Sequence, residues 1–201
     1  MRSLLLAAAL AASTLASAQV LDSRTFSTEG HPVQAIWAPD GQHVLVTVAN
    51  QRGSGIEIFR VDGDKLKRET YQPIGNENAQ GILLIPHTGL LAVGLSNVGV
   101  AFLPLDATLK GKATPRAISQ GDRPGSGYLA VTPDGSTLFV ANEYGQGGNV
   151  GVIALPRDDQ NRLTPTATAQ ILTPDTTASP DGRALLLTVY LGNELMLLTM
   201  K

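Results

Sequence analysis

Gly127-Tyr-Leu-Ala-Val-Thr-Pro-Asp-Gly-Ser-Thr-Leu-Phe-Val-Ala-Asn-Glu143 places a Pro-Asp-Gly turn between two apolar runs. Related turns occur at prolines that are 47 residues apart each time, namely Pro39, Pro86, Pro133 and Pro180. Proline presets φ for a tight turn, aspartate bonds to the backbone ahead of it, and glycine accepts a positive φ. A constant period of this size indicates one structural unit that is repeated four times.

Each unit divides into four short strands. In the first unit they are expected near residues 33–38, 43–49, 55–61 and 66–73. The second strands are almost continuously apolar, which suits strands buried on both faces where sheets stack. The fourth strands are more polar, as expected at the outside of a stack. The densest basic cluster, Lys65, Lys67 and Arg68, is therefore predicted to lie on the solvated face of an outer strand.

Four-stranded antiparallel units of this length, arrayed around an axis, describe an all-β fold, the β-propeller. The predicted blade repeats are 31–77, 78–124, 125–171 and 172–201. The last unit is short, and residues 20–30 are expected to supply its missing outer strand and close the ring. Two alternatives remain open: a closed ring of four blades, or an open half-ring that is a fragment of a larger propeller or half of a homodimer.

The stretch from Gly127 to Glu143 resembles the YVTN repeat of bacterial β-propellers, in which a Ser-Pro-Asp-Gly turn precedes a Tyr-Val-Thr/Ala-Asn strand. Val150 to Leu155, a polar loop and Arg162-Leu-Thr-Pro165 resemble the lactonase-type branch of that family. This branch includes 6-phosphogluconolactonase-like and carboxymuconate cyclase-like proteins. The resemblance is sharpest in the third unit. The family's usual propeller has seven blades, whereas this chain has material for about four, so an inherited active site does not follow.

The first 18 residues read as a secretory signal. Arg2 gives a positive start, Leu4 to Leu15 an apolar stretch, and Ala16-Ser-Ala18 a small-residue cleavage site. The alternative is a buried N-terminal helix. Cleavage after Ala18 would leave residues 19–201 as one propeller domain, located in the periplasm or secreted. No later segment has the length and apolarity of a membrane span.

Composition limits the function classes. The chain has no cysteine, which excludes thiolate metal sites and cysteine nucleophiles, and its net charge is −2. Nucleic-acid binding needs a basic face, so it is not expected. His31, His43 and His87 lack metal-ligand spacing, and neither a metal nor a cofactor is predicted. The expected partner is a small acidic ligand or another protein.

The candidate site is the rim where each first strand begins. Arg123 would pair with a carboxylate, while His31 or Glu77 would move a proton. The ligand-binding candidates are two neighbours on the rim and two residues of the longest hairpin: Asn78, Asp122, Glu143 and Tyr144. The simpler alternative is that all of these are ordinary polar residues of a rim and a glycine-rich hairpin.

Other distinctive residues have structural interpretations. The turn aspartates Asp40, Asp134 and Asp181 recur because the turn recurs. His87 takes the place of the turn aspartate in the second unit. Trp37 is expected to pack in the core, with stacking on a ligand at the channel wall as the alternative.

Three functional hypotheses follow. The first is an exported propeller that acts as a ligand- or protein-binding module. The second is a lactonase-type hydrolase that acts on a sugar-acid or other lactone through His31, Glu77 and Arg123. The third is a remnant of a larger propeller.

Overall fold

The computed structural model describes residues 24–50, 53–118, 126–142, 149–158, 163–171, 176–178, 184–189 and 194–199. The first sheet consists of β1 (His31–Trp37), β2 (His43–Asn50), β3 (Gly53–Asp62) and β4 (Lys65–Gly75). The second consists of β5 (Ala79–Ile85), β6 (Leu90–Leu95), β7 (Gly99–Pro104) and β8 (Arg116–Ile118), with the one-turn helix α1 (Leu105–Thr108) after β7. The third consists of β9 (Ser126–Val131), β10 (Thr137–Asn142), β11 (Asn149–Ala154) and β12 (Thr166–Ile171). The last consists of β13 (Thr176–Ala178), β14 (Ala184–Val189) and β15 (Glu194–Thr199).

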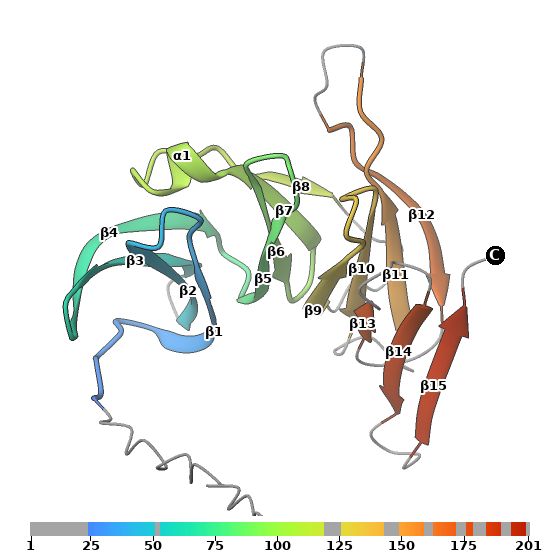
Figure 1. Cartoon of the computed structure of the whole chain (residues 1–201), viewed down its shortest axis with the longest axis horizontal. Coiled ribbons are helices and arrows are strands. Elements are labelled where there is room, and N and C mark those ends of the chain that lie inside the picture. The colour runs from blue at the N-terminus through green and yellow to red at the C-terminus, as the bar shows by residue number, and fades with distance from the viewer. Residues whose placement is uncertain are drawn as a thin grey trace, which may run out of the picture.

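The four sheets are antiparallel and stand side by side along an arc (Figure 1). The first strand of each sheet lies on the concave inner side of the arc, and β4, β8 and β12 lie on its outer side (Figure 1). Contacts between neighbouring sheets include those of β1 with β5, β5 with β9, and β9 with β13. The sheets are thus blades of a β-propeller, and the predicted all-β propeller fold is confirmed. How many blades complete the ring stays a prediction.

The predicted strands of the first unit agree with the structure to within two residues at each end. The turn chemistry explains this accuracy. The Asp40 carboxylate accepts hydrogen bonds from the backbone N–H groups of Gln42 (2.8 Å) and His43 (3.1 Å), and Gly41 has φ +65°. Asp134 bonds in the same way to the N–H of Ser136 (3.0 Å). The two described turn aspartates therefore have the structural role that was predicted.

The turn of the second blade differs from the prediction for His87. His87 has φ +61°, which lies in the left-handed region that residues other than glycine seldom adopt. The Thr88 hydroxyl, and not His87, takes the aspartate's role, because it accepts a hydrogen bond from the N–H of Leu90 (3.0 Å) and donates one to the carbonyl oxygen of Ile85 (2.8 Å). The turn has the same length as those of the first and third blades, but its hydrogen-bonding side chain and its glycine each lie one position later.

The core is divided between the blades. One cluster joins the first and second blades and includes the fully buried residues Leu45, Ile58, Leu91 and Leu103. A second cluster joins the second and third blades and includes Ile85, Leu138, Val140 and Ile153. Each middle strand thus contributes side chains to both of its faces, as its nearly continuous apolar sequence predicted.

Polar side chains also connect the first blade to the second. The Gln34 side-chain oxygen accepts a hydrogen bond from the N–H of Ile82 (2.9 Å), and the Thr47 hydroxyl donates one to the carbonyl oxygen of Gln80 (2.6 Å). The amide of Gln72 bonds to both backbone groups of Ala113, accepting from N–H (2.7 Å) and donating to C=O (3.0 Å). Gln72 is buried, so each of these bonds replaces one that water would otherwise supply.

Two expectations concern the ends of the arc. Residues 24–30 belong to the segment predicted to complete the last blade; they form no strand and contact the first blade instead, through Arg24 with Asp64 and Glu29 with Arg68. Ring closure by residues 20–30, the repeat boundaries and the homodimer all stay predictions.

Of the basic cluster, Lys65 and Lys67 are exposed on outer strand β4 as predicted, whereas Arg68 is partly buried.

Candidate functional site

The described rim residues lie where inner strands begin. His31 is the first residue of β1 and is exposed, while Glu77 and Asn78 directly precede β5. Because β1 and β5 are equivalent strands of neighbouring blades, their starts lie on the same edge of the arc. The predictions for four other residues fall outside the described residues: Asp122, Arg123, Glu143 and Tyr144.

Glu77 is held by its neighbours in the second blade and the first. Its carboxylate accepts a hydrogen bond from the side-chain amide of Asn97 (2.7 Å), and its backbone carbonyl oxygen accepts one from the Ser54 hydroxyl. Ser54 is buried, which fixes the backbone at this point of the edge. The carboxylate itself is only partly buried and reaches solvent, so a ligand at the edge could contact it.

A second group of charges lies at the other end of the first blade. The His43 ring nitrogens contact Asp40 Oδ2 (2.6 Å) and Glu69 Oε2 (3.2 Å), so the imidazole connects the β1–β2 turn to strand β4. The hydrogen bond from the N–H of Gln42 and the one from the His43 ring lower the pKa of Asp40 below its usual value. This group braces a turn at the surface. Within the described ranges, no cluster of three or more His, Cys, Asp or Glu residues could hold a metal ion.

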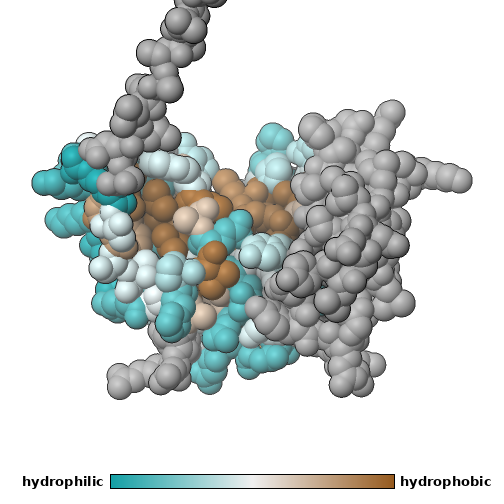
Figure 2. Space-filling view, turned by 90° about the horizontal axis from the view of Figure 1, so that it is seen from below, coloured by the Kyte–Doolittle hydropathy of each residue, from teal (hydrophilic) through white to brown (hydrophobic). Residues whose placement is uncertain are grey.

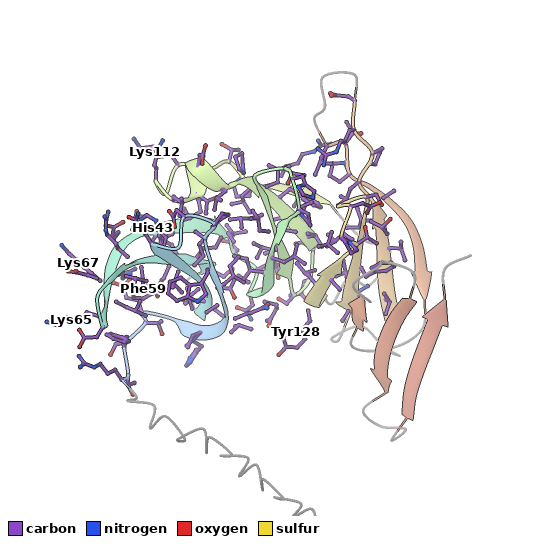
Figure 3. The ribbon with its side chains drawn as sticks, in the orientation of Figure 1. His43, Phe59, Lys65, Lys67, Lys112 and Tyr128 are labelled. Carbon is purple, nitrogen blue, oxygen red and sulfur yellow. The ribbon has the colours of Figure 1, made fainter. Side chains whose placement is uncertain are left out.

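The concave face presents apolar and aromatic side chains. Figure 2 shows an apolar band in the hollow of this face, bordered above and below by hydrophilic residues. The inner strands contribute apolar residues that are only partly buried: Val33, Ile36, Leu83, Leu84, Leu129 and Ala130. Tyr128 of β9 is 47% exposed and points into the open side of the arc (Figure 3).

Trp37 is 59% exposed, so the expectation that it packs in the core is wrong. It ends β1 and lies opposite Val44 in the β1–β2 register, which places both side chains on the same face of the first sheet. That face points away from the second blade. The alternative, an indole that stacks on a ligand at the channel wall, stays a prediction.

Sequence reasoning missed the tight packing of the inner strands around Gly81. A Cβ atom at Gly81 would lie 2.6 Å from the carbonyl oxygen of Gly127 and 3.0 Å from Cα of Tyr128. Gln34, Gly81 and Tyr128 are 47 residues apart and occupy equivalent positions of the repeat. The 47-residue spacing was the available signal, because it places Gly81 and Tyr128 at equivalent positions of neighbouring inner strands.

The comparisons with known proteins concern the fold. No family model matches the chain, and no curated protein matches it. Among solved structures, a candidate 6-phosphogluconolactonase from Bacteroides uniformis is 16% identical, with a TM-score of 0.73, over 85% of this chain and 51% of that one. A candidate 6-phosphogluconolactonase from Bacteroides fragilis is also 16% identical, with a TM-score of 0.69 over the same shares.

A third structure, the β-propeller domain of Cps50 (Swd1) from Myceliophteria thermophila, is 12% identical, with a TM-score of 0.58, over 79% of this chain and 53% of that one. The chain therefore spans about half the length of these propellers. In the described part of the chain, no helix is long and apolar enough to cross a membrane. At these identities the likeness concerns the fold alone, and the fold of this chain is a β-propeller similar to those of these structures.

Proposed function

We propose that this chain is an exported lactonase-like propeller that acts as a binding module, with the concave face as its contact surface. The observation that carries the proposal is the apolar band on the inner strands together with the half-exposed Tyr128 (Figures 2 and 3). Tyrosine and tryptophan dominate the binding energy of many protein interfaces, because each offers a large rigid surface at a low cost in entropy. The partner that fits this surface best is a protein segment with apolar side chains.

A photo-crosslinking amino acid at position 128 tests this proposal in cells that export the protein. A matched variant carries the same group at position 112, because Lys112 is exposed on the outer side of the arc (Figure 3). A discrete adduct from position 128 that is absent from position 112 supports the concave face as the contact surface. Equal labelling from both positions, or none from position 128, contradicts it. The mass of the exported protein checks the predicted cleavage after Ala18.

The second candidate is a lactonase-type hydrolase at the edge of the arc. The observation that favours it is that His31 and Glu77, the two candidates for moving a proton, both lie at the starts of neighbouring inner strands. Under this proposal, Arg123→Ala abolishes turnover of a lactone without lowering the melting temperature. Arg116→Ala on outer strand β8 is the control and keeps full activity. If the native protein hydrolyses no member of a lactone panel faster than buffer alone, this candidate is excluded.

A further inference from the structure

The first blade has an apolar face on the side away from the second blade. In β2, Leu45 belongs to the core shared with the second blade, so the alternating residues Val44, Val46 and Val48 point to the opposite face. Together with Phe59 of β3 they form a separate cluster, and none of the four is more than 9% exposed. This face, which we call the free face, has the apolar character of the faces that pack between blades.

The segment 24–30, which we call the strap, lies against the free face. Gly30 contacts it closely: a Cβ atom at this position would lie 2.9 Å from Cβ of Val48 and 3.0 Å from the carbonyl oxygen of Ala49. Any side chain at position 30 would therefore lift the strap from β2. At its other end, the Arg24 guanidinium forms an ion pair with Asp64 (2.5 Å) in the β3–β4 turn. The strap is thus fixed at both ends.

A buried carboxylate holds the strap between these ends. Glu57 of β3 is fully buried on the free face, and its Oε1 accepts hydrogen bonds from the backbone N–H groups of Glu29 (2.7 Å) and Gly30 (3.3 Å). Arg68 of β4 completes the group, because it pairs with Glu29 and places its Nε 3.3 Å from Glu57 Oε2. A buried charge is tolerated only when it is paired and hydrogen-bonded. The strap therefore supplies partners that Glu57 requires.

We propose that the strap is an N-terminal cap that prevents the free face from associating with another β-sheet. Terminal units of repeat proteins need such caps, because the face that would meet a neighbouring repeat is otherwise open to water and to other chains. Trp37 shows which part of this face the strap does not cover, since it lies in register with Val44 and is 59% exposed. Release of the strap would extend that exposed surface to Val48, the residue of the free face that Gly30 contacts.

Two substitutions release the strap from opposite sides. Glu57→Ala removes the acceptor on the blade, and Gly30→Val adds side-chain atoms where the strap meets Val48. Amide hydrogen exchange of residues 24–30 reports release, and light scattering over a range of concentrations reports association. Glu69→Ala is the matched control, because it removes a carboxylate of the same blade that pairs with His43 and Arg60 and not with the strap. Glu57→Gln keeps an oxygen acceptor and should largely restore protection.

In the native protein, the amides of Glu29 and Gly30 should exchange slowly. In both release variants they should exchange at least tenfold faster, and the apparent mass should rise with concentration, while β5–β7 keep their protection. Protection that survives in Gly30→Val would overturn the proposal, as would fast exchange of the strap with an unchanged mass. If Glu57→Ala loses its cooperative thermal transition, the result for Gly30→Val decides, because that substitution leaves the blade's own residues unchanged.

Discussion

Gly81 offers a sharp test of how the inner strands pack. Gly81→Ala adds one methyl group at a position where Cβ would lie 2.6 Å from the carbonyl oxygen of Gly127 and 3.0 Å from Cα of Tyr128. Ordinary van der Waals contact begins at 3.4 Å. Both neighbours are backbone atoms, so no side-chain rotation can relieve the contact, and β5 and β9 would have to separate by roughly 0.8 Å.

The magnitude follows from two opposing effects. Overpacking of this kind lowers the free energy of unfolding by about 1–3 kcal/mol. Replacing glycine raises it by about 0.4–1 kcal/mol, because the unfolded chain then has fewer conformations. The free energy of unfolding should therefore fall by about 1.5 kcal/mol, which for a domain of this size lowers the melting temperature by about 3–6 °C.

Thermal unfolding followed by circular dichroism measures this shift. The control is Gly63→Asn, because Gly63 has φ +59° and open space around it, and asparagine adopts the left-handed region at low cost. That control should stay within about 0.5 kcal/mol of the native protein. A melting temperature for Gly81→Ala that equals that of the control would refute the close approach of β5 and β9.

Three further predictions concern polar groups. Gln72→Leu leaves both backbone groups of Ala113 without their partners and should lower the free energy of unfolding by about 2–3 kcal/mol in urea titrations; a change below 1 kcal/mol would contradict the buried bonds. The Thr132 hydroxyl and the N–H of Ser136 lower the pKa of Asp134 from 3.8, so Asp134 stabilises the fold above that value and loses this effect as pH falls through its folded-state pKa. Asp134→Ala should therefore lower the melting temperature at pH 7 and have less effect near pH 2; an equal effect at both would refute the ionic contribution. Burial and the Glu57 charge raise the pKa of Tyr71 above 10.0, so stability should fall as pH rises above 10, and Tyr71→Phe should abolish that loss, as a melting series from pH 8 to 11 can measure.

The blades could be predicted from sequence because their signals are local. Pro-Asp-Gly turns at Pro39 and Pro133 fix where strands end, and the apolar runs between turns fix which strands are buried on both faces. The turn of the second blade was harder to predict, because Thr88 takes the aspartate's role one position later and His87 adopts a positive φ.

The candidate site could be predicted only in part, because it depends on which blade faces meet. The Ile-Glu-Ile-Phe run of β3 predicts a strand, yet nothing local shows that Glu57 is buried beneath a segment 28 residues away. The same reason explains Trp37: its apolar character predicts burial, but its sheet face has no blade against it among the described residues. Such outcomes depend on contacts between distant parts of the chain, and a single sequence does not encode them in any one stretch.

The polar bonds between the first two blades have a mechanical consequence. Apolar faces alone could slide past each other, since dispersion contacts have little direction, whereas the bonds of Gln34 with Ile82 and Gln72 with Ala113 hold only at one offset between the sheets. Gln34 lies on inner strand β1 and Gln72 on outer strand β4. Because the two bonds are at opposite edges of the first sheet, they fix the angle between the two sheets as well as their offset. These bonds therefore hold the curvature of this half of the arc, and under the proposed binding function a partner would adapt its own shape to that curvature.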